Sequence, residues 1–147
     1  MAAPAGQSSL IDIDATYLPI QQMRQIARIT ALDGATITGE VDLGSDHWVY
    51  AQHFPGDPIF PGALIIEAAG QLVALWAWAD GQRGRPRLVK TSAEFRAPVE
   101  IEDPQIVLDA VVRRKRHLNF ADVTVRTQRQ VVASVSMVLA VVPAAGA

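Results

Sequence analysis

The sequence contains no cysteine, and its 147 residues show no large excess of either charge. The absence of cysteine excludes disulfide bonds, thiolate zinc sites, iron–sulfur clusters and a cysteine nucleophile. A formal net charge of -2 provides no basic excess to neutralise phosphates, so we expect no nucleic-acid partner. The motifs of a serine nucleophile elbow, a phosphate-binding glycine loop and a dinucleotide site are also missing. Serine hydrolysis, nucleotide use and hydride transfer are therefore without support.

The overall composition is typical of one soluble globular domain. Half of the residues are hydrophobic and 19% are charged, which argues against a disordered chain. We place the domain at residues 10–147, after a small, polar segment at residues 1–9 that we expect to be frayed. Because the N-terminus lacks a basic stretch followed by a long apolar run, we expect a cytoplasmic location.

One long apolar stretch runs from Pro61 to Ala79, and Glu67 and Gln71 are its only strongly polar residues. A membrane span is disfavoured, because a carboxylate at the centre of a bilayer costs about 2.5–3.5 kcal/mol on insertion scales. The flanks of the stretch also lack the basic and aromatic residues that anchor such spans. We therefore predict a helix buried inside the protein that ends near Asp80-Gly81.

The segment before this helix predicts a short helix and then a β-hairpin. Pro19 suits the start of a helix. Four apolar residues after it fall on one helical stripe: Ile20, Met23, Ile26 and Ala27. Asp33-Gly34 is a strong two-residue turn signal between segments rich in β-branched residues, so it predicts the hairpin.

The segment after the long helix predicts an antiparallel sheet. Four runs are rich in β-branched residues and read as long strands: Leu88 to Phe95, Ile106 to Val112, Phe120 to Arg126 and Val131 to Val142. Together with the hairpin and the long helix, they indicate an α+β fold in which an antiparallel sheet wraps around one central apolar helix.

Glu67 is a candidate general acid, because it lies in the middle of the apolar helix. A carboxyl group removed from water either finds a partner or takes up a proton. Gln71 lies four residues later on the same helical face, where its amide can hold the Glu67 carboxyl group. A purely structural Glu–Gln pair at an interface explains the same pattern, and composition alone does not decide between them.

His53 is a candidate general base, because it opens a loop that Pro55, Pro58 and Pro61 hold rigidly. A loop histidine that only binds the backbone explains the same residue. The helix after the loop begins at Gly62, where free amide hydrogens favour negative charge and a ligand can approach closely. A base, an acid and an oxyanion donor thus lie within fifteen residues.

No metal site is predicted. His47, His53 and Asp57 lie close together in the sequence, but their spacing matches no known ligand pattern.

The segment His-Phe-Pro-Gly-Asp-Pro-Ile-Phe-Pro-Gly at residues 53–62, followed by Glu67 and Gln71, closely resembles a known motif. It is similar to that of bacterial (3R)-3-hydroxyacyl-[acyl-carrier-protein] dehydratases of the hot-dog fold, the FabZ/FabA type. The spacings from histidine to glycine, from histidine to acid and from acid to glutamine all fit. The strong likeness covers about residues 48–79, and residues 94–99 resemble the strand that follows the helix in the family.

The resemblance implies a hot-dog fold and an elimination of water without a metal or other cofactor. In that reaction His53 removes a C2 proton from a 3-hydroxyacyl thioester, and Glu67 gives a proton to the departing C3 hydroxyl group. The Gly62 amide polarises the thioester carbonyl. In the family the histidine and the acid come from different subunits, so a homodimer, or a trimer of dimers, is expected.

The resemblance also implies residues for the substrate tunnel and for a carrier protein. Four residues of the motif loop are expected to line the tunnel: Phe54, Ile59, Phe60 and Pro61. Four consecutive basic residues at a predicted turn between strands are candidates for docking an acidic acyl carrier protein, whose phosphopantetheine arm delivers the substrate: Arg113, Arg114, Lys115 and Arg116. Five other basic residues can extend that patch: Arg83, Arg85, Arg87, Lys90 and Arg96. A solvated turn explains the four consecutive charges equally.

Three alternatives remain open. Glu67 matches the simple dehydratases, whereas Trp48 and Gln71-Leu72-Val73 resemble the branch of the family that also moves the double bond. A bifunctional dehydratase and isomerase is therefore one alternative, and a non-catalytic acyl-carrier-binding module is another. A thioesterase of the same fold is less favoured, because that chemistry usually places the carboxylate to direct water. The resemblance implies a role in fatty-acid, polyketide or related lipid biosynthesis and does not indicate which of these pathways.

Overall fold

A computed structural model describes residues 13–143, and its elements follow the predicted order except for the helix expected after Pro19. The segment at residues 1–9 that we expect to be frayed lies outside the described residues. Within residues 13–143 there are two short 3-10 helices, η2 (Gln21–Met23) and η3 (Trp48–Ala51), and the α-helix α1 spans Gly62–Ala79. Six strands form the sheet: β1 (Arg28–Asp33), β2 (Thr36–Asp42), β3 (Arg85–Phe95), β4 (Gln105–Lys115), β5 (Leu118–Arg126) and β6 (Val131–Val142).

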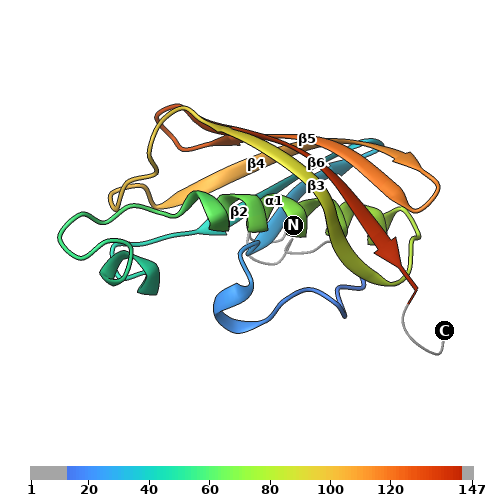
Figure 1. Cartoon of the computed structure of the whole chain (residues 1–147), viewed down its shortest axis with the longest axis horizontal. Coiled ribbons are helices and arrows are strands. Elements are labelled where there is room, and N and C mark those ends of the chain that lie inside the picture. Colours follow the sequence, from blue (N-terminus) through green and yellow to red (C-terminus); the bar gives the residue numbers. More distant parts are fainter. Residues whose placement is uncertain (1–12, 144–147) are drawn as a thin grey trace, which may run out of the picture.

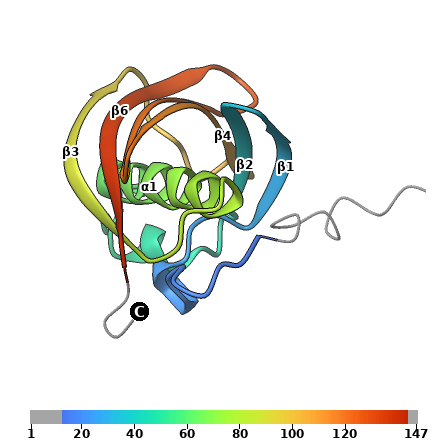
Figure 2. The same ribbon diagram turned by 90° about the vertical axis from the view of Figure 1, so that its right-hand side faces the viewer.

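The six strands form one antiparallel sheet in the order β1-β2-β4-β5-β6-β3. The sheet lies along α1 in Figure 1 and curls around the helix when the molecule is viewed end-on in Figure 2. This is the α+β plan expected from the sequence. By length and composition α1 could cross a membrane, but most of it is buried inside this sheet, so it is the core helix of the domain.

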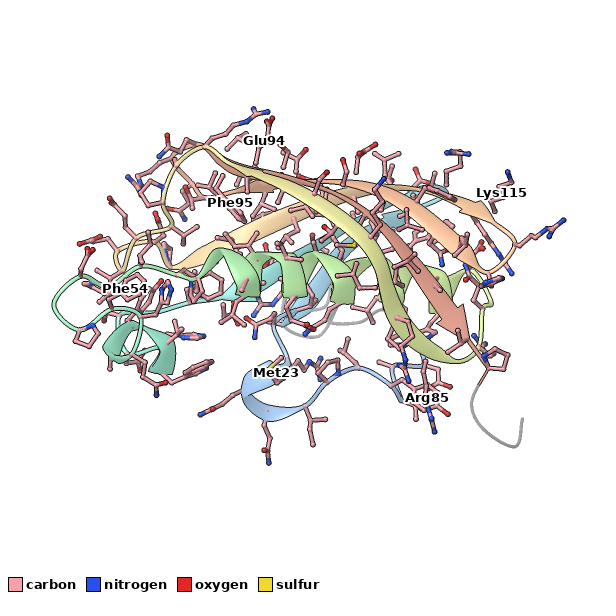
Figure 3. All side chains as sticks on the ribbon, viewed as in Figure 1. Met23, Phe54, Arg85, Glu94, Phe95 and Lys115 are labelled. Carbon is pink, nitrogen blue, oxygen red and sulfur yellow. The ribbon has the colours of Figure 1, made fainter. Side chains whose placement is uncertain are left out.

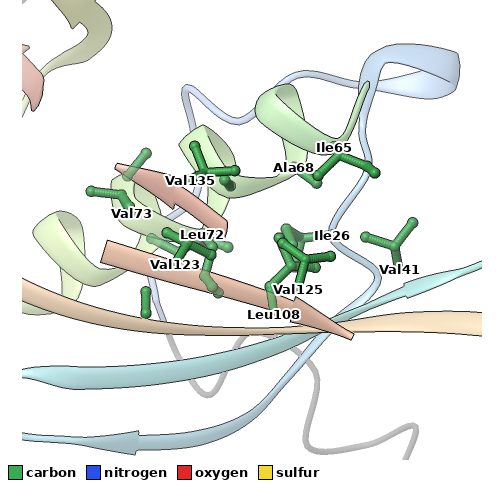
Figure 4. Close-up of a cluster of buried hydrophobic side chains, with 14 of the residues drawn as sticks. Ile26, Val41, Ile65, Ala68, Leu72, Val73, Leu108, Val123, Val125 and Val135 are labelled. Atoms are coloured by element: carbon green, nitrogen blue, oxygen red, sulfur yellow. The ribbon is translucent and has the colours of Figure 1, made fainter. Parts of the chain in front are cut away.

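The core lies between α1 and the inner face of the sheet. Figure 4 shows Leu72 of α1 among valine and leucine side chains from the strands, including Val123 and Leu108, and all three are at most 1% exposed. Gly39 of β2 lies so close to the helix that a Cβ atom at this position would stand 2.8 Å from Cδ1 of Leu72. The missing side chain lets β2 approach α1 closely.

The predicted hairpin is present. Asp33 pairs with Thr36, which leaves Gly34 and Ala35 as a two-residue turn between β1 and β2. Gly34 has φ 57°, a value that glycine adopts without the steric cost met by other residues.

The predicted helix after Pro19 is wrong. Only the short turn η2 forms there, and Ile20 and Met23 are 72% and 51% exposed, whereas Ile26 is completely buried. The backbone of this segment is held by a long-range partner, because Gln71 of α1 binds the Met23 carbonyl and the Ile26 N–H group. These tertiary hydrogen bonds replace those that a helix would make.

Candidate active site

The loop that carries His53 is closed by a tight turn that its sequence dictates. The N–H groups of Phe54 and Asp57 each donate to the carbonyl of the other residue at 2.9 Å. Pro55 and Gly56 occupy the two central positions, and Gly56 has φ 79°, which is the geometry of a type II turn. The loop also lies against residues 99–100 through an isolated β-bridge between Ile59 and Glu100. These backbone contacts restrict the loop in addition to its prolines.

One ring nitrogen of His53 is held by this loop. Nδ1 lies 3.0 Å from the carbonyl oxygen of Ile59. A carbonyl oxygen can only accept a hydrogen bond, so Nδ1 carries the proton when the ring is neutral. Nε2 then has the free electron pair, as a general base requires. The ring of Phe54 stacks on His53 with the centroids 3.9 Å apart.

The 3-10 turn that leads into this loop has a capped start and buries Val49 and Tyr50. The N–H group of His53 donates to the Val49 carbonyl at 2.8 Å, and the side chain of His47 accepts from the Val49 N–H group at 3.2 Å. Burial among aromatic rings lowers the pKa of His47. Burial likewise raises the pKa of Tyr50 to about 12. Burial therefore favours the neutral forms of His47 and Tyr50 at the base of the loop.

Helix α1 begins directly after the loop, with Pro61 at the N-cap position. Among the described residues, the N–H group of Gly62 has no hydrogen-bond acceptor, so it remains free to bind a negative charge. The ring of Phe95 packs over Gly62, and a Cβ atom on Gly62 would stand 2.8 Å from that ring. Only glycine fits at this position without moving Phe95.

Gln71 holds the carboxyl group of Glu67, as the four-residue spacing predicted. The Gln71 amide nitrogen donates to Glu67 Oε2 at 2.8 Å and to the Met23 carbonyl at 2.7 Å. Its oxygen accepts from the N–H groups of Gln25 and Ile26 at 2.8 and 3.2 Å. Because the oxygen faces two donors, the orientation of the amide is determined by the network. The side chain of Gln71 is 3% exposed and fully bonded.

Glu67 lies on the wall of a groove of about 440 Å³ that runs along α1. Residues 17–19, residues 85–88 and Leu139 form the other walls. Ala63, Gly70 and Ala74 share this helical face with Glu67, and their small size keeps the groove open. The full withdrawal of Glu67 from water that the apolar sequence suggested is therefore wrong within one chain. The residue is half-buried, because small neighbours leave one face of the helix uncovered.

The structure does not bring the loop and the groove together within one chain. Neither His53 nor any of the four expected tunnel residues lines the groove. Phe54 is half-exposed at one end of the molecule in Figure 3, and Phe60 is buried against the ring of His47. Ile59 and Pro61 are partly buried next to them. Their role in a substrate tunnel stays a prediction that needs a second subunit.

The predicted basic turn is only partly a turn. Strand β4 continues to Lys115, so Arg113, Arg114 and Lys115 pair with β5, and only Arg116 and the next residue form the turn. The reason is that the sheet continues through these residues, with Arg113 stacked over Phe120 at 5.0 Å. Arg114 instead forms an ion pair with Asp80 at 3.1 Å. The four side chains are exposed, and their role in docking remains a prediction.

The groove also contains residues that the sequence analysis did not assign to the site. Tyr17 forms part of its wall, and Arg85 and Arg87 line one end, although the sequence suggested these arginines only as an extension of a docking patch. The sequence could have indicated this pair, because Arg85 and Arg87 are two residues apart at the start of a strand, and such residues lie on the same face.

Comparisons with known proteins give one family and one fold. A family model described as the FabA-like domain matches residues 18–136. The solved structure of AziG from S. sahachiroi is 16% identical, with 80% of this chain and 91% of that chain covered and a TM-score of 0.62. The E. coli PaaI protein from the phenylacetic acid degradation operon is 18% identical, with 76% and 80% covered and a TM-score of 0.62. A hypothetical thioesterase with coenzyme A from Streptococcus pneumoniae TIGR4 is 12% identical, with 79% and 85% covered and a TM-score of 0.62. At these identities the structural similarity shows the fold alone.

Proposed function

Because the chain belongs to the FabA-like domain family and has the hot-dog fold, both as its sequence predicts, we propose that it is a (3R)-3-hydroxyacyl-[acyl-carrier-protein] dehydratase. Family and fold support the broader class, an enzyme that acts on acyl thioesters. The narrower assignment is supported by the chemistry of His53 and Glu67.

The observation that carries the proposal is the Gln71 amide, which holds the Glu67 carboxyl group at the wall of a mainly apolar groove. Among the residues of 13–143 that line the groove, Glu67 is the only carboxylate. An acid held by a buried, fully bonded amide has a defined position, which general acid catalysis requires. His53 complements it, because its Nδ1 is held by a carbonyl and its Nε2 is the basic nitrogen.

The proposed reaction is an elimination in which each proton has a named carrier. His53 Nε2 takes the proton from C2 of the 3-hydroxyacyl thioester, and the electron pair of that C–H bond forms the C2–C3 double bond. The C3–O bond breaks, and the hydroxyl group leaves as water with a proton from Glu67. The Gly62 N–H group stabilises the negative charge that develops on the thioester oxygen. The products are a trans-2-enoyl thioester and water, and transfer of the proton from His53 back to Glu67 restores the enzyme.

The reaction requires His53 of one subunit to face Glu67 of the partner subunit, because the two do not share a groove within one chain. Hot-dog proteins typically form dimers or larger oligomers. In this chain the two edge strands of the sheet differ in length and in apolar exposure. Edge strand β1 is short and bears the ion pair of Arg28 with Glu40. Edge strand β3 has 11 residues and exposes Leu88, Val89 and Phe95. An exposed apolar edge favours pairing with another chain, so β3 is the proposed dimer contact.

The first test measures the activity of two variants on a 3-hydroxydecanoyl carrier-protein thioester. His53→Ala and Glu67→Gln are each expected to lower turnover at least about a hundredfold, since each removes a positioned base or acid. His117→Ala and Glu102→Gln make the same chemical changes at exposed positions outside β3 and should leave turnover near the wild-type value. Unchanged turnover in both site variants would refute the assignment.

The second test mixes the two inactive variants to ask whether the site is shared between subunits. After random exchange, half of the dimers are mixed, and each mixed dimer contains one site with both His53 and Glu67. Activity should therefore return to roughly a quarter of the wild-type value. A site contained within one chain would give no recovery, because every chain in the mixture has one lesion.

The products of the wild-type reaction separate the alternatives. A 3-enoyl product beside the 2-enoyl thioester would indicate that the enzyme also moves the double bond. Release of free thiol without an enoyl product would indicate thioester hydrolysis, the activity for which the Streptococcus pneumoniae neighbour is named. Binding of the thioester without any product would indicate a non-catalytic module.

A further inference from the structure

Two guanidinium groups lie at one end of the groove. Arg85 and Arg87 are the first and third residues of β3, so their side chains share one face of the strand, and both line the groove. Figure 3 shows Arg85 beside the segment that precedes β1, at the opposite end of the molecule from Phe54. The basic end of the groove is therefore remote from the His53 loop of the same chain.

No carboxylate neutralises these two charges within residues 13–143, because neither arginine takes part in an ion pair there. Arg85 lies over the ring of Tyr17, 5.7 Å from its centroid, and Arg87 donates to the carbonyl of Pro86 at 2.8 Å. These contacts hold the side chains without removing their charge. Guanidinium groups that are not paired with a carboxylate bind phosphate well, because they donate several hydrogen bonds in one plane.

The distance from this basic end to Glu67 follows from the geometry of the helix. The indole N–H group of Trp78 donates to the Gly84 carbonyl at 3.0 Å, which places the end of α1 next to the start of β3. Trp78 is eleven residues after Glu67, and a rise of 1.5 Å per residue separates them by about 16 Å. The arm of phosphopantetheine has roughly thirteen bonds between phosphorus and sulfur, about 15 Å when extended like a peptide. The two lengths match.

We propose that Arg85 and Arg87 bind the phosphate group of a phosphopantetheine thioester, whose arm lies along α1 and brings the thioester to Glu67. This inference rests on the proposed function only for the identity of the acyl group. The arm occupies the groove kept open by Gly70 and Ala74, and its phosphate remains at the exposed end. The acyl chain then continues past Glu67 toward Ala63, at the first turn of α1.

The basic residues at the end of β4 are less suited to the phosphate. Arg114 is already paired with Asp80, and Arg113 stacks over Phe120, which lies in a separate hollow on the outer side of the sheet. That hollow shares no residue with the groove.

The test compares the binding of 4′-phosphopantetheine and of pantetheine, which lacks the phosphate, by calorimetry. The full chain should bind 4′-phosphopantetheine at least about tenfold more tightly, and the double variant Arg85→Gln with Arg87→Gln should lose this preference. Lys90→Gln also removes one positive charge from β3 but lies in the outer hollow, so the preference should remain. Equal binding of the two compounds by the wild type, or an unchanged preference in the double variant, would overturn the proposal. So would the absence of detectable binding at millimolar 4′-phosphopantetheine.

Kinetics then identify the source of the phosphate, because both coenzyme A and acyl carrier protein bear it. The source is the one whose 3-hydroxyacyl thioester gives the higher wild-type kcat/KM, and the double variant should lower that value at least about tenfold. The double variant and the wild type should act equally on the pantetheine thioester. A loss of the same size on the pantetheine thioester would show that the arginines do not act through phosphate. If the wild type forms no enoyl product at all, the proposed function fails, while the binding comparison still decides the role of the arginines.

Discussion

At the scale of single residues, Gln71 connects α1 to the segment that precedes β1. Its amide joins α1 to the backbone of residues 23–26 and to the carboxyl group of Glu67. Buried polar groups in such networks are costly to leave unpaired. Gln71 therefore stabilises the segment beside the groove and orients the proposed acid, and these two effects can be measured separately.

Gln71→Met should lower the free energy of unfolding by about 1–3 kcal/mol, because the N–H groups of Gln25 and Ile26 lose their acceptor. The kcat should fall as well, since Glu67 loses the donor that orients it. Denaturant unfolding and steady-state kinetics measure the two effects. Gln22→Met makes the same change at an exposed position and should alter neither. Full activity in Gln71→Met would show that Glu67 needs no support.

His47 should make the stability of the loop depend on pH. Burial lowers the pKa of His47 in the folded state, whereas in the unfolded chain the pKa is about 6.5. As the pH falls through that value, the unfolded chain takes up a proton that the folded protein resists, so the free energy of unfolding decreases. Below the folded pKa, protonation also removes the acceptor for Val49.

The measurement is denaturant unfolding of the wild type and of His47→Asn between about pH 7 and pH 5. Asparagine can still cap the Val49 N–H group but does not titrate. The wild type should lose more stability than the variant over this range. Parallel losses in the two proteins would assign the pH dependence to other groups.

At the scale of elements, the contact between α1 and the sheet is uneven. On one side of the helix Gly39 of β2 lies against Leu72, and on the other side Gly70 faces the groove, where the nearest atom to an added Cβ is 3.9 Å away. The helix thus packs tightly on the sheet and leaves the Glu67 side open. The groove exists because small residues stand on that side.

Alanine substitutions on the two sides of α1 should change the free energy of unfolding in opposite directions. Gly39→Ala forces a methyl group against Leu72 and should lower the free energy of unfolding by about 1–3 kcal/mol. Gly70→Ala brings its methyl group only into ordinary van der Waals contact with Leu139 and removes a flexible residue from a helix, so it should raise the same quantity by up to about 1 kcal/mol. Thermal or denaturant unfolding gives both values. Destabilisation by Gly70→Ala would mean that this face is covered.

At the scale of the whole molecule, the monomer lacks a complete site, and the exposed edge strand β3 is where we propose that a second chain completes it. The groove beside Glu67 is formed within one chain, but the His53 loop of that chain does not line it. This loop projects from the end of the molecule in Figure 1. An edge strand with exposed apolar side chains is a template for pairing. In the proposed dimer, pairing at β3 covers these side chains and supplies the missing loop.

Val89→Lys should weaken the dimer, because it places a charge on an apolar edge residue that is 60% exposed in the monomer. The dissociation constant measured by sedimentation should rise at least about tenfold, and activity at low protein concentration should fall with it. Val111→Lys is a matched control, since Val111 is 58% exposed but lies on the interior strand β4. An unchanged dimer in Val89→Lys would place the contact elsewhere.

The sequence by itself determined those features whose free energy is local. The turn at Gly34 and the bounds of α1 depend on glycine and proline backbones and on a continuous apolar run, so local patterns predicted them. The spacing of Glu67 and Gln71 likewise follows from helix geometry. The motif at residues 53–62 was sufficient to predict the family and, through it, the fold.

The tertiary structure alone decided what distant segments do to one another. The segment at Gln21–Met23 remained a single turn because a glutamine some 45 residues away takes its backbone hydrogen bonds, and no local propensity reports such a partner. The placement of Arg85 and Arg87 at the end of the Glu67 groove depends in the same way on how β3 returns beside α1. Contacts between distant segments form only when the chain has closed, so their energies leave no signal in short stretches of sequence.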